Sequence, residues 1–339
     1  MFGLDFQIVN LIRQPYFNRL MIEYIYLILG LALLYNGAGY LVEGSSSLAK
    51  KLGISALVIG LTVVAFGTSM PELIVNVFAS LKGNAEVSYG NIIGSNIFNI
   101  LLILGLASVI KPLAVQRSTV WKEIPFALLA ALVLFAMSNK LLLGGAANNL
   151  TIADGLIMLF FFVIFLYYVF ELAKDKPKES NMEIEVKKHS STAIFLMIIG
   201  GLAALFIGGK LTVAGAVAIA RQIGISELLI SSTIIAAGTS LPELVTSVVA
   251  AIKKEMDLSV GNVVGSNIFN IFLIMGVSSL ISPLAVPAGI NFDFIFLTAT
   301  TLLLFIFMFI GKKHELDRWE GAMFLLMYVA YVAFIIRRG

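Results

Sequence analysis

The chain has 339 residues, of which 59% are hydrophobic and only 13% are charged, and its formal net charge is +3. Soluble domains carry about twice that share of charged residues, so the composition excludes an ordinary soluble protein and indicates a helical membrane protein. The absence of cysteine excludes disulfides, thiol catalysis and zinc–thiolate or iron–sulfur centres.

Apolar stretches long enough to cross a bilayer as helices recur along the whole chain. In chain order, the ten expected spans are 24–43, 55–81, 87–110, 122–138, 152–172, 193–219, 226–252, 258–281, 291–311 and 319–337. A polar stretch follows the fifth span. We therefore divide the chain into an N-terminal half, 1–173, a linker, 174–190, and a C-terminal half, 191–339.

The two halves repeat each other in sequence. AFGTSMPEL at 65–73 returns as AAGTSLPEL at 236–244, and GNIIGSNIFN at 90–99 returns as GNVVGSNIFN at 261–270. An odd number of spans per repeat places the second copy upside down relative to the first, an arrangement typical of transporters with a site at mid-membrane. The sequence therefore predicts an all-α membrane protein with ten transmembrane helices in two inverted-topology five-helix repeats.

The second span combines a proline with polar groups near its middle. Pro71 lacks an amide hydrogen and clashes with the carbonyl four residues back, so we expect the helix to break near Gly67 and to free backbone carbonyls around 65–68. A carboxylate at this depth costs at least about 2.5 kcal/mol, which makes a functional role the default. The polar groups form an oxygen ligand set of the kind that Ca²⁺ and Na⁺ prefer. They are Thr68, Ser69 and Glu72, repeated in the seventh span as Thr239, Ser240 and Glu243.

A polar stripe runs along one face of the third and the eighth span. Residues four apart share a helix face, so the stripe forms a second layer of polar groups beside the broken spans. Its members are Asn91, Ser95 and Asn99 in the third span, and Asn262, Ser266 and Asn270 in the eighth. Small residues allow membrane helices to approach closely, which we expect at Gly90, Gly94 and Gly105.

Together, GTSxPEL and GNxxGSNIFN in two copies resemble the signature of the cation/calcium exchanger superfamily, most like its prokaryotic sodium/calcium exchangers. The resemblance covers nearly the whole chain. It implies an antiporter that exchanges Na⁺ for Ca²⁺ by alternating access, without covalent chemistry and therefore not an enzyme. The transported ions are the implied ligands, with no cofactor, and no partner is implied besides the lipid bilayer, neither nucleic acid nor protein.

The resemblance also assigns roles to residues. It implies that Ca²⁺ is bound by the carboxylates of Glu72 and Glu243 with main-chain oxygens of Thr68 and Thr239. The implied sodium ligands are Ser69, Ser240, Ser95, Ser266 and the carbonyls of Ala65 and Ala236, and the central polar pair is Asn99 and Asn270. Some relatives have Asp in place of Asn270, so involvement of potassium or protons stays open.

Three other functions were weighed against sodium/calcium exchange. A proton/calcium exchanger would use the same glutamates. A cation channel would have similar oxygen ligands, although internal duplication with broken helices favours an exchanger. An intramembrane hydrolase would need a metal-binding His pair or an Asp dyad, and the expected spans contain neither. A stoichiometry of three Na⁺ to one Ca²⁺ would make exchange electrogenic.

Fifteen of the 23 lysines and arginines lie on the same side of the expected spans as the linker. By the positive-inside rule, the 174–190 linker is expected to be cytoplasmic and both termini extracellular. We therefore expect a multi-pass protein of the cell membrane.

Overall fold

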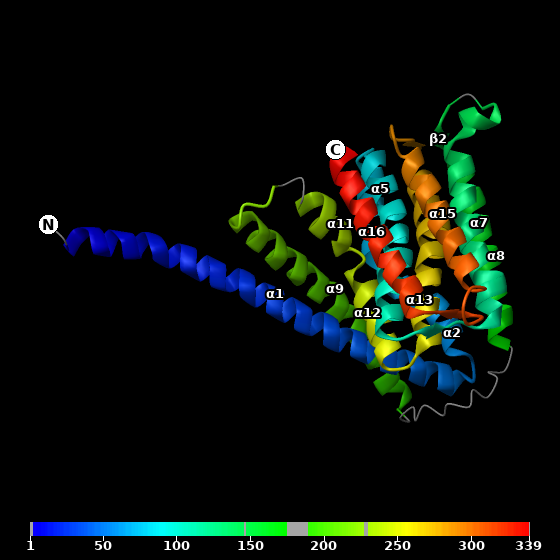
Figure 1. The fold of residues 1–339 in the computed structure, drawn as a ribbon, viewed down its shortest axis with the longest axis horizontal. Coiled ribbons are helices and arrows are strands. Elements are labelled where there is room, and N and C mark those ends of the chain that lie inside the picture. Colours follow the sequence, from blue (N-terminus) through cyan, green and yellow to red (C-terminus); the bar gives the residue numbers. More distant parts are fainter. Residues whose placement is uncertain (1–2, 146, 175–188, 227–229, 339) are drawn as a thin grey trace.

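The computed structural model describes residues 3–145, 147–174, 189–226 and 230–338, and it is almost entirely helical (Figure 1). Most of the expected linker, residues 175–188, lies outside the described residues. The helices of the first half are α1 (Gly3–Leu52), α2 (Ala56–Ile59), η1 (Gly60–Val64), α3 (Ala65–Thr68), α4 (Met70–Leu81), α5 (Ala85–Phe98), η2 (Asn99–Leu104), α6 (Gly105–Ile110), η3 (Thr119–Glu123), α7 (Ile124–Ser138), η4 (Lys140–Leu143) and α8 (Ile152–Lys174).

The helices of the second half follow the same order. They are α9 (Ser191–Gln222), η5 (Ile230–Ile235), α11 (Ala236–Gly238), α12 (Leu241–Ile252), α13 (Met256–Ile268), η6 (Phe269–Met275), α14 (Gly276–Ile281), α15 (Asn291–Phe307) and α16 (Arg318–Arg338). Within the described residues, seven helices are long and apolar enough to cross a membrane, and a bent pair over residues 56–81 makes an eighth. The protein is therefore an all-α membrane protein.

The expected break in the second span is confirmed. Helix α3 ends at Thr68 and α4 begins at Met70, and the segments 56–68 and 70–81 are bent by 46° relative to each other. Ser69 joins them with φ −82° and ψ 5°, outside regular helix. Pro71 lies in the first turn of α4, where backbone amides have no hydrogen-bond partner within the helix, so the missing amide hydrogen of proline costs nothing. Ser240 repeats this geometry before α12, with φ −90° and ψ 7°.

Regular α-helix gives way to a π-helical turn in each of the four central spans. The turns are η1 and η2 in the first half and η5 and η6 in the second. Such turns widen a helix locally and are frequent at functional sites. Asn99 begins η2, and Asn270 is the second residue of η6. Both asparagines of the expected central pair therefore lie at a change of helix type.

The first helices of the two halves, α1 and α9, lie against each other (Figure 1). A Cβ added to Gly37 would lie 2.9 Å from the carbonyl oxygen of Gly201, and one added to Gly30 would lie 2.8 Å from that of Gly208. Because later residues of α1 meet earlier residues of α9, the helices run antiparallel. The glycines recur every seven residues on both helices: Gly30, Gly37 and Gly44 on α1, and Gly201, Gly208 and Gly215 on α9.

The close approach expected at three other glycines occurs at only one of them. A Cβ on Gly105 would lie 3.1 Å from the carbonyl oxygen of Gly321 on α16. By contrast, a Cβ on Gly90 or Gly94 would meet nothing within 4 Å, so the expectation was wrong there. These two glycines face open space.

Two short antiparallel strand pairs join the halves outside the helices. In one, β1 (Leu113–Ala114) pairs with β4 (Glu315–Leu316), and Leu113 lies opposite Leu316. In the other, β2 (Asn149–Leu150) pairs with β3 (Leu284–Ala285), and Leu150 lies opposite Leu284. Each pair connects a segment of one half to a segment of the other, so the halves are held together at both pairs.

The continuous helices α5–η2–α6 and α13–η6–α14 are the most buried of the membrane-length helices, whereas α8 and α16 bury only a small share of their residues. A large cluster of buried apolar side chains packs around them and includes Tyr89, Ile97, Phe165, Phe272 and Phe294. The polar stripe of the third and eighth spans therefore lies in the interior, surrounded by hydrocarbon side chains.

Candidate functional site

Two buried glutamates stand at the centre of the site. Glu72 lies in the first turn of α4, and Glu243 lies in the first turn of α12, each directly after a helix break. Their exposed fractions are 0% and 1%. The N-terminus of a helix favours a negative charge, so both carboxylates sit where the backbone partly offsets the cost of burial.

The serines at the two breaks bind the carboxylates crosswise. Ser69 Oγ donates a 3.0 Å hydrogen bond to Glu243 Oε1, and Ser240 Oγ donates a 2.9 Å bond to Glu72 Oε1. Glu72 has a second neighbour, because Ser95 Oγ lies 3.4 Å from the same oxygen and 3.0 Å from Ser240 Oγ. Each carboxylate is thus held by the broken helix of the opposite repeat.

Asparagines of the polar stripe hold the backbone at the breaks. Asn91 Nδ2 donates to the carbonyl oxygen of Glu72 at 3.3 Å, and Thr239 Oγ1 lies 3.4 Å from Asn91 Oδ1. In the other repeat, Asn262 Nδ2 donates to the carbonyl of Glu243 at 3.5 Å and Thr68 Oγ1 donates to Asn262 Oδ1 at 3.0 Å. The two expected threonines therefore contact the stripe of the opposite half.

Four buried asparagines form a ring where α5 meets α13. Asn99 Nδ2 donates to Asn267 Oδ1, and Asn270 Nδ2 donates to Asn96 Oδ1, each at 2.9 Å. Asn96 Nδ2 in turn donates to the carbonyl of Asn267 at 3.2 Å, and Asn267 Nδ2 donates to the carbonyl of Asn96 at 3.3 Å. The amide hydrogens of Asn99 and Asn270 are thus turned toward the opposite helix.

Five buried oxygens of the site have no hydrogen-bond partner in the protein. In apolar surroundings such atoms are costly unless something else binds them. Two belong to carboxylates, two to amides and one to a hydroxyl: Glu72 Oε2, Glu243 Oε2, Asn99 Oδ1, Asn270 Oδ1 and Ser266 Oγ. All five oxygens can coordinate a cation, and Na⁺ and Ca²⁺ prefer oxygen ligands of this kind.

The expected carbonyl ligands lie at the starts of the short helices before the breaks. The carbonyl oxygen of Ala65 accepts a 3.0 Å hydrogen bond from the Ser69 amide, and Thr68 Oγ1 lies 3.4 Å from the same oxygen. Ala236 begins α11 at the equivalent place. Within the described part of the chain, no cluster of three or more His, Cys, Asp or Glu occurs, so the charge of the site comes from its two glutamates.

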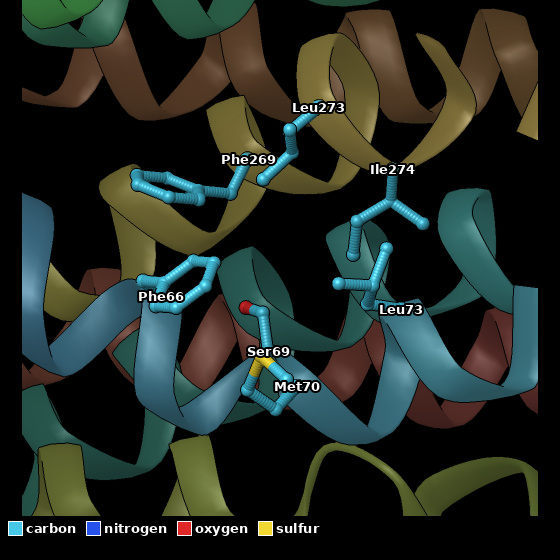
Figure 2. A pocket seen from close by; sticks show the side chains of 7 residues that line it. All are labelled: Phe66, Ser69, Met70, Leu73, Phe269, Leu273 and Ile274. Carbon is cyan, nitrogen blue, oxygen red and sulfur yellow. The ribbon is translucent and has the colours of Figure 1, made fainter. Parts of the chain in front are cut away.

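An apolar pocket lies against the first helix break (Figure 2). Figure 2 shows Ser69 with its hydroxyl toward the rings of Phe66 and Phe269, whose centroids are 5.9 Å apart. Leu73 and Ile274 also line the pocket, which leaves no room for a water molecule. These side chains close the route to the Ser69 hydroxyl from this side.

The glutamates, serines, threonines and the Asn99–Asn270 pair were expected at the site from the sequence, and the structure brings side chains of both repeats together. Asn96 and Asn267, whose partners lie in the other half of the chain, were not expected there. The repeated motif GSNIFN contains both, so the duplicated asparagine was the available signal.

Comparisons with known proteins agree with this geometry. The family model described as sodium/calcium exchanger protein matches residues 22–171 and 193–337. CaxA of Alkalimonas amylolytica, provisionally named an antiporter, is 38% identical over 92% of this chain and 98% of its own. The sodium/calcium exchanger MaX1 of Methanosarcina acetivorans is 31% identical over 92% of this chain and 97% of its own.

A solved structure of the sodium–calcium exchanger NCX_Mj superposes with a TM-score of 0.79 and 34% identity, over 93% of this chain and 99% of that one. Another NCX_Mj structure, from a crystal soaked with Na⁺ and Sr²⁺, has a TM-score of 0.78 over 93% of this chain and 98% of its own. Family and fold both indicate a transporter rather than an enzyme and support exchange of cations for Ca²⁺. The chain belongs to the sodium/calcium exchanger protein family.

Proposed function

We propose that the chain exchanges Na⁺ for Ca²⁺ by alternating access to one central site. The observation that carries the proposal is the set of five buried oxygens without partners, two of which belong to the carboxylates of Glu72 and Glu243. A hard cation satisfies oxygens of this kind and neutralises the buried charge. The site contains residues of both repeats. Alternating access requires this arrangement, because one part of the protein moves against the other around the site.

The proposed ligands divide by charge. Ca²⁺ is bound by the two glutamates, with main-chain oxygens of Thr68 and Thr239, because a divalent ion is best matched by two carboxylates. Na⁺ is bound by neutral oxygens beside them. These are Ser69, Ser240, Ser95, Ser266 and the carbonyls of Ala65 and Ala236. Asn99 and Asn270 form the central polar pair, and their amide oxygens face the ions of the shared site. The hydrogen bonds of Ser69 and Ser240 to the carboxylates support the placement of both ligand groups around a shared site.

The charge of the site favours electrogenic exchange. With both glutamates ionised, the ion-free site carries −2, one Ca²⁺ neutralises it, and three Na⁺ leave +1. An uncompensated charge is costly in a buried site, so Ca²⁺ and a full load of Na⁺ compete. Three-for-one exchange moves one charge per cycle, worth about 2.3 kcal/mol per 100 mV, and an inside-negative potential then favours calcium exit.

The proposed topology has ten crossings in two inverted repeats, in the cell membrane. The antiparallel packing of α1 against α9, the first helix of each half, supports inversion of the second repeat. The broken span over 56–81, the second broken span, which ends in α12, and the shorter helix α15 bring the seven membrane-length helices to ten crossings. The excess of Lys and Arg on one side places the 174–190 linker in the cytoplasm and both termini outside.

The proposal is tested by sodium-driven uptake of radiolabelled Ca²⁺ into proteoliposomes. Glu72→Gln and Glu243→Gln keep the size of the side chain and remove its charge, so uptake is abolished while the protein still folds. Glu123→Gln is the matched control, because Glu123 is also fully buried but accepts its hydrogen bond from Tyr168, away from the site.

Near-normal uptake by either site variant would refute the assignment. The proton-coupled rival is distinguished in the same vesicles. Uptake driven by a pH gradient without sodium would favour that rival, which the comparisons do not favour. Ca²⁺ uptake down its own gradient, with neither a sodium gradient nor a pH gradient required, would favour a channel.

A further inference from the structure

Two asparagines of the central ring, Asn96 and Asn267, contribute no free oxygen to the site. They hydrogen-bond the other two, Asn270 and Asn99, whose side-chain oxygens are free. We propose that Asn96 and Asn267 are positioning residues, which turn the amide oxygens of Asn270 and Asn99 toward the transported ions. The inference rests on the proposed ion site and adds to it two residues that the ligand set does not contain. Each acts across the interface, because Asn96 of α5 holds Asn270 of η6 and Asn267 of α13 holds Asn99 of η2.

The orientation of the positioning pair is fixed by donors and acceptors. Asn96 Nδ2 donates to the main-chain carbonyl of Asn267, and Asn267 Nδ2 donates to the main-chain carbonyl of Asn96. A carbonyl accepts but does not donate, so a flipped amide would set two oxygens against each other. Both side chains are buried, with exposed fractions of 0% and 4%, so water does not replace these bonds. Each Oδ1 is therefore held toward its neighbour.

This fixed acceptor determines how the ligand asparagines lie. Asn270 meets Asn96 Oδ1 and Asn99 meets Asn267 Oδ1, and both do so with their NH₂ groups. Their own Oδ1 atoms are consequently left without partners. Rotation of either amide by half a turn would place an NH₂ group, which repels cations, at the position of the ligand oxygen. The ring thus selects the one orientation that binds a cation.

The ring differs from the buried Asn139 in the range of its contacts. Asn139 bonds only the carbonyl of Phe135, one turn earlier in its own helix, and its oxygen is also without a partner. The bonds of the ring join residues 168 to 174 positions apart in the chain. Local packing alone does not require side-chain amides of one repeat to hydrogen-bond those of the other repeat beside the ion ligands.

The test is a double-mutant cycle on equilibrium binding of Ca²⁺, measured with the purified full chain in detergent. A hydrogen bond in a buried site is worth about 1 kcal/mol, so Asn96→Ala should weaken binding about fivefold. Asn270→Ala removes the ligand oxygen itself and should weaken binding at least as much. If Asn96 acts through Asn270, the double variant binds no more weakly than Asn270→Ala alone.

The crossed pairing supplies an internal control. Asn96→Ala combined with Asn99→Ala should give the product of the two single effects, because Asn96 does not hold Asn99. The mirror cycle of Asn267→Ala with Asn99→Ala should again show no additional loss, and it serves where a variant of Asn96 fails to fold. Asn139→Ala controls for the loss of a buried amide and should leave Ca²⁺ binding unchanged.

Independent effects of Asn96→Ala and Asn270→Ala would overturn the inference, as would an equal loss of binding in Asn139→Ala. Failure of the proposed function gives a different result. In that case the wild-type protein itself does not couple Ca²⁺ uptake to a sodium gradient. Wild-type exchange together with independent effects in both cycles would leave the function standing and remove the positioning role alone.

Discussion

The two serines at the helix breaks are equivalent in sequence, but the structure predicts different consequences for their removal. Glu243 Oε1 accepts a hydrogen bond from Ser69, and its Oε2 has no partner. Ser69→Ala therefore leaves Thr68 as the remaining side-chain hydrogen-bond neighbour of this carboxylate. Glu72 also accepts from Ser95 at 3.4 Å and has Thr239 as a further neighbour, so Ser240→Ala leaves two side-chain neighbours in place. The Ser69 variant should be the less stable of the two.

The magnitude follows from the charge of the acceptor. A hydrogen bond to a charged group contributes about 1.5–3 kcal/mol, so Ser69→Ala should destabilise the ion-free protein by about that amount. With Ser95 still in contact, Ser240→Ala should cost about 1 kcal/mol. For a chain of this length, the usual unfolding entropy converts these losses to melting shifts of about 2–4 °C and about 1–2 °C.

The assay is thermal unfolding in detergent, first with a chelator and without sodium, then with saturating Ca²⁺ or Na⁺. Ca²⁺ binds the carboxylate directly, so it should restore most of the stability that Ser69→Ala loses. Na⁺ should restore less, because Ser69 is itself a proposed sodium ligand. Ser108→Ala is the control, since Ser108 donates only to the carbonyl of Gly105 in its own helix. Equal shifts in the two site variants, or a loss that persists unchanged in Ca²⁺, would refute the reasoning.

Three further predictions concern coupling, topology and packing. Sodium-driven Ca²⁺ uptake should respond to a potential clamped with potassium and valinomycin, and indifference to the clamp would indicate two-for-one exchange. A single cysteine introduced in the 174–190 linker should resist an impermeant thiol reagent applied to intact cells, and labelling from outside would reverse the orientation. Gly37→Val should destabilise the protein by about 1–3 kcal/mol, because its Cβ would lie 2.9 Å from the Gly201 carbonyl. Gly39→Val, with only Lys253 Nζ at 3.9 Å, should be tolerated, and similar melting temperatures for both would contradict this packing.

The features that the sequence predicted are those that depend on local chemistry. Pro71 disrupts the helix whatever its surroundings, so the break could be placed within a few residues of Ser69. A glutamate in an apolar span requires compensation in any fold, so Glu72 and Glu243 were identifiable without knowledge of their neighbours. Duplication then indicated that the two would act together.

The features that were missed depend on which helices meet. A stripe of residues four apart identified Asn99 but not Asn96, because the partner of Asn96 lies in the other repeat. The short strand pairs were also unpredicted, since two residues carry no alternation pattern. Gly90 and Gly94 were expected to touch neighbouring helices on the strength of their motif. Which glycines actually touch was decided by tertiary packing, and close contacts occur between α1 and α9, between α6 and α16 and between α8 and α14.

The seven-residue glycine spacing on α1 and α9 has a consequence for how the protein is made. About 140 residues separate the end of α1 from the start of α9, which corresponds to roughly 7–28 s of synthesis. Throughout that interval, the glycine face of α1 borders lipid or a chaperone instead of its partner. The packing of α1 against α9 is therefore completed only after α1 has been inserted, and it depends on synthesis of the second half. Halves of the chain synthesised separately should assemble with each other in one membrane, whereas either half alone should be degraded.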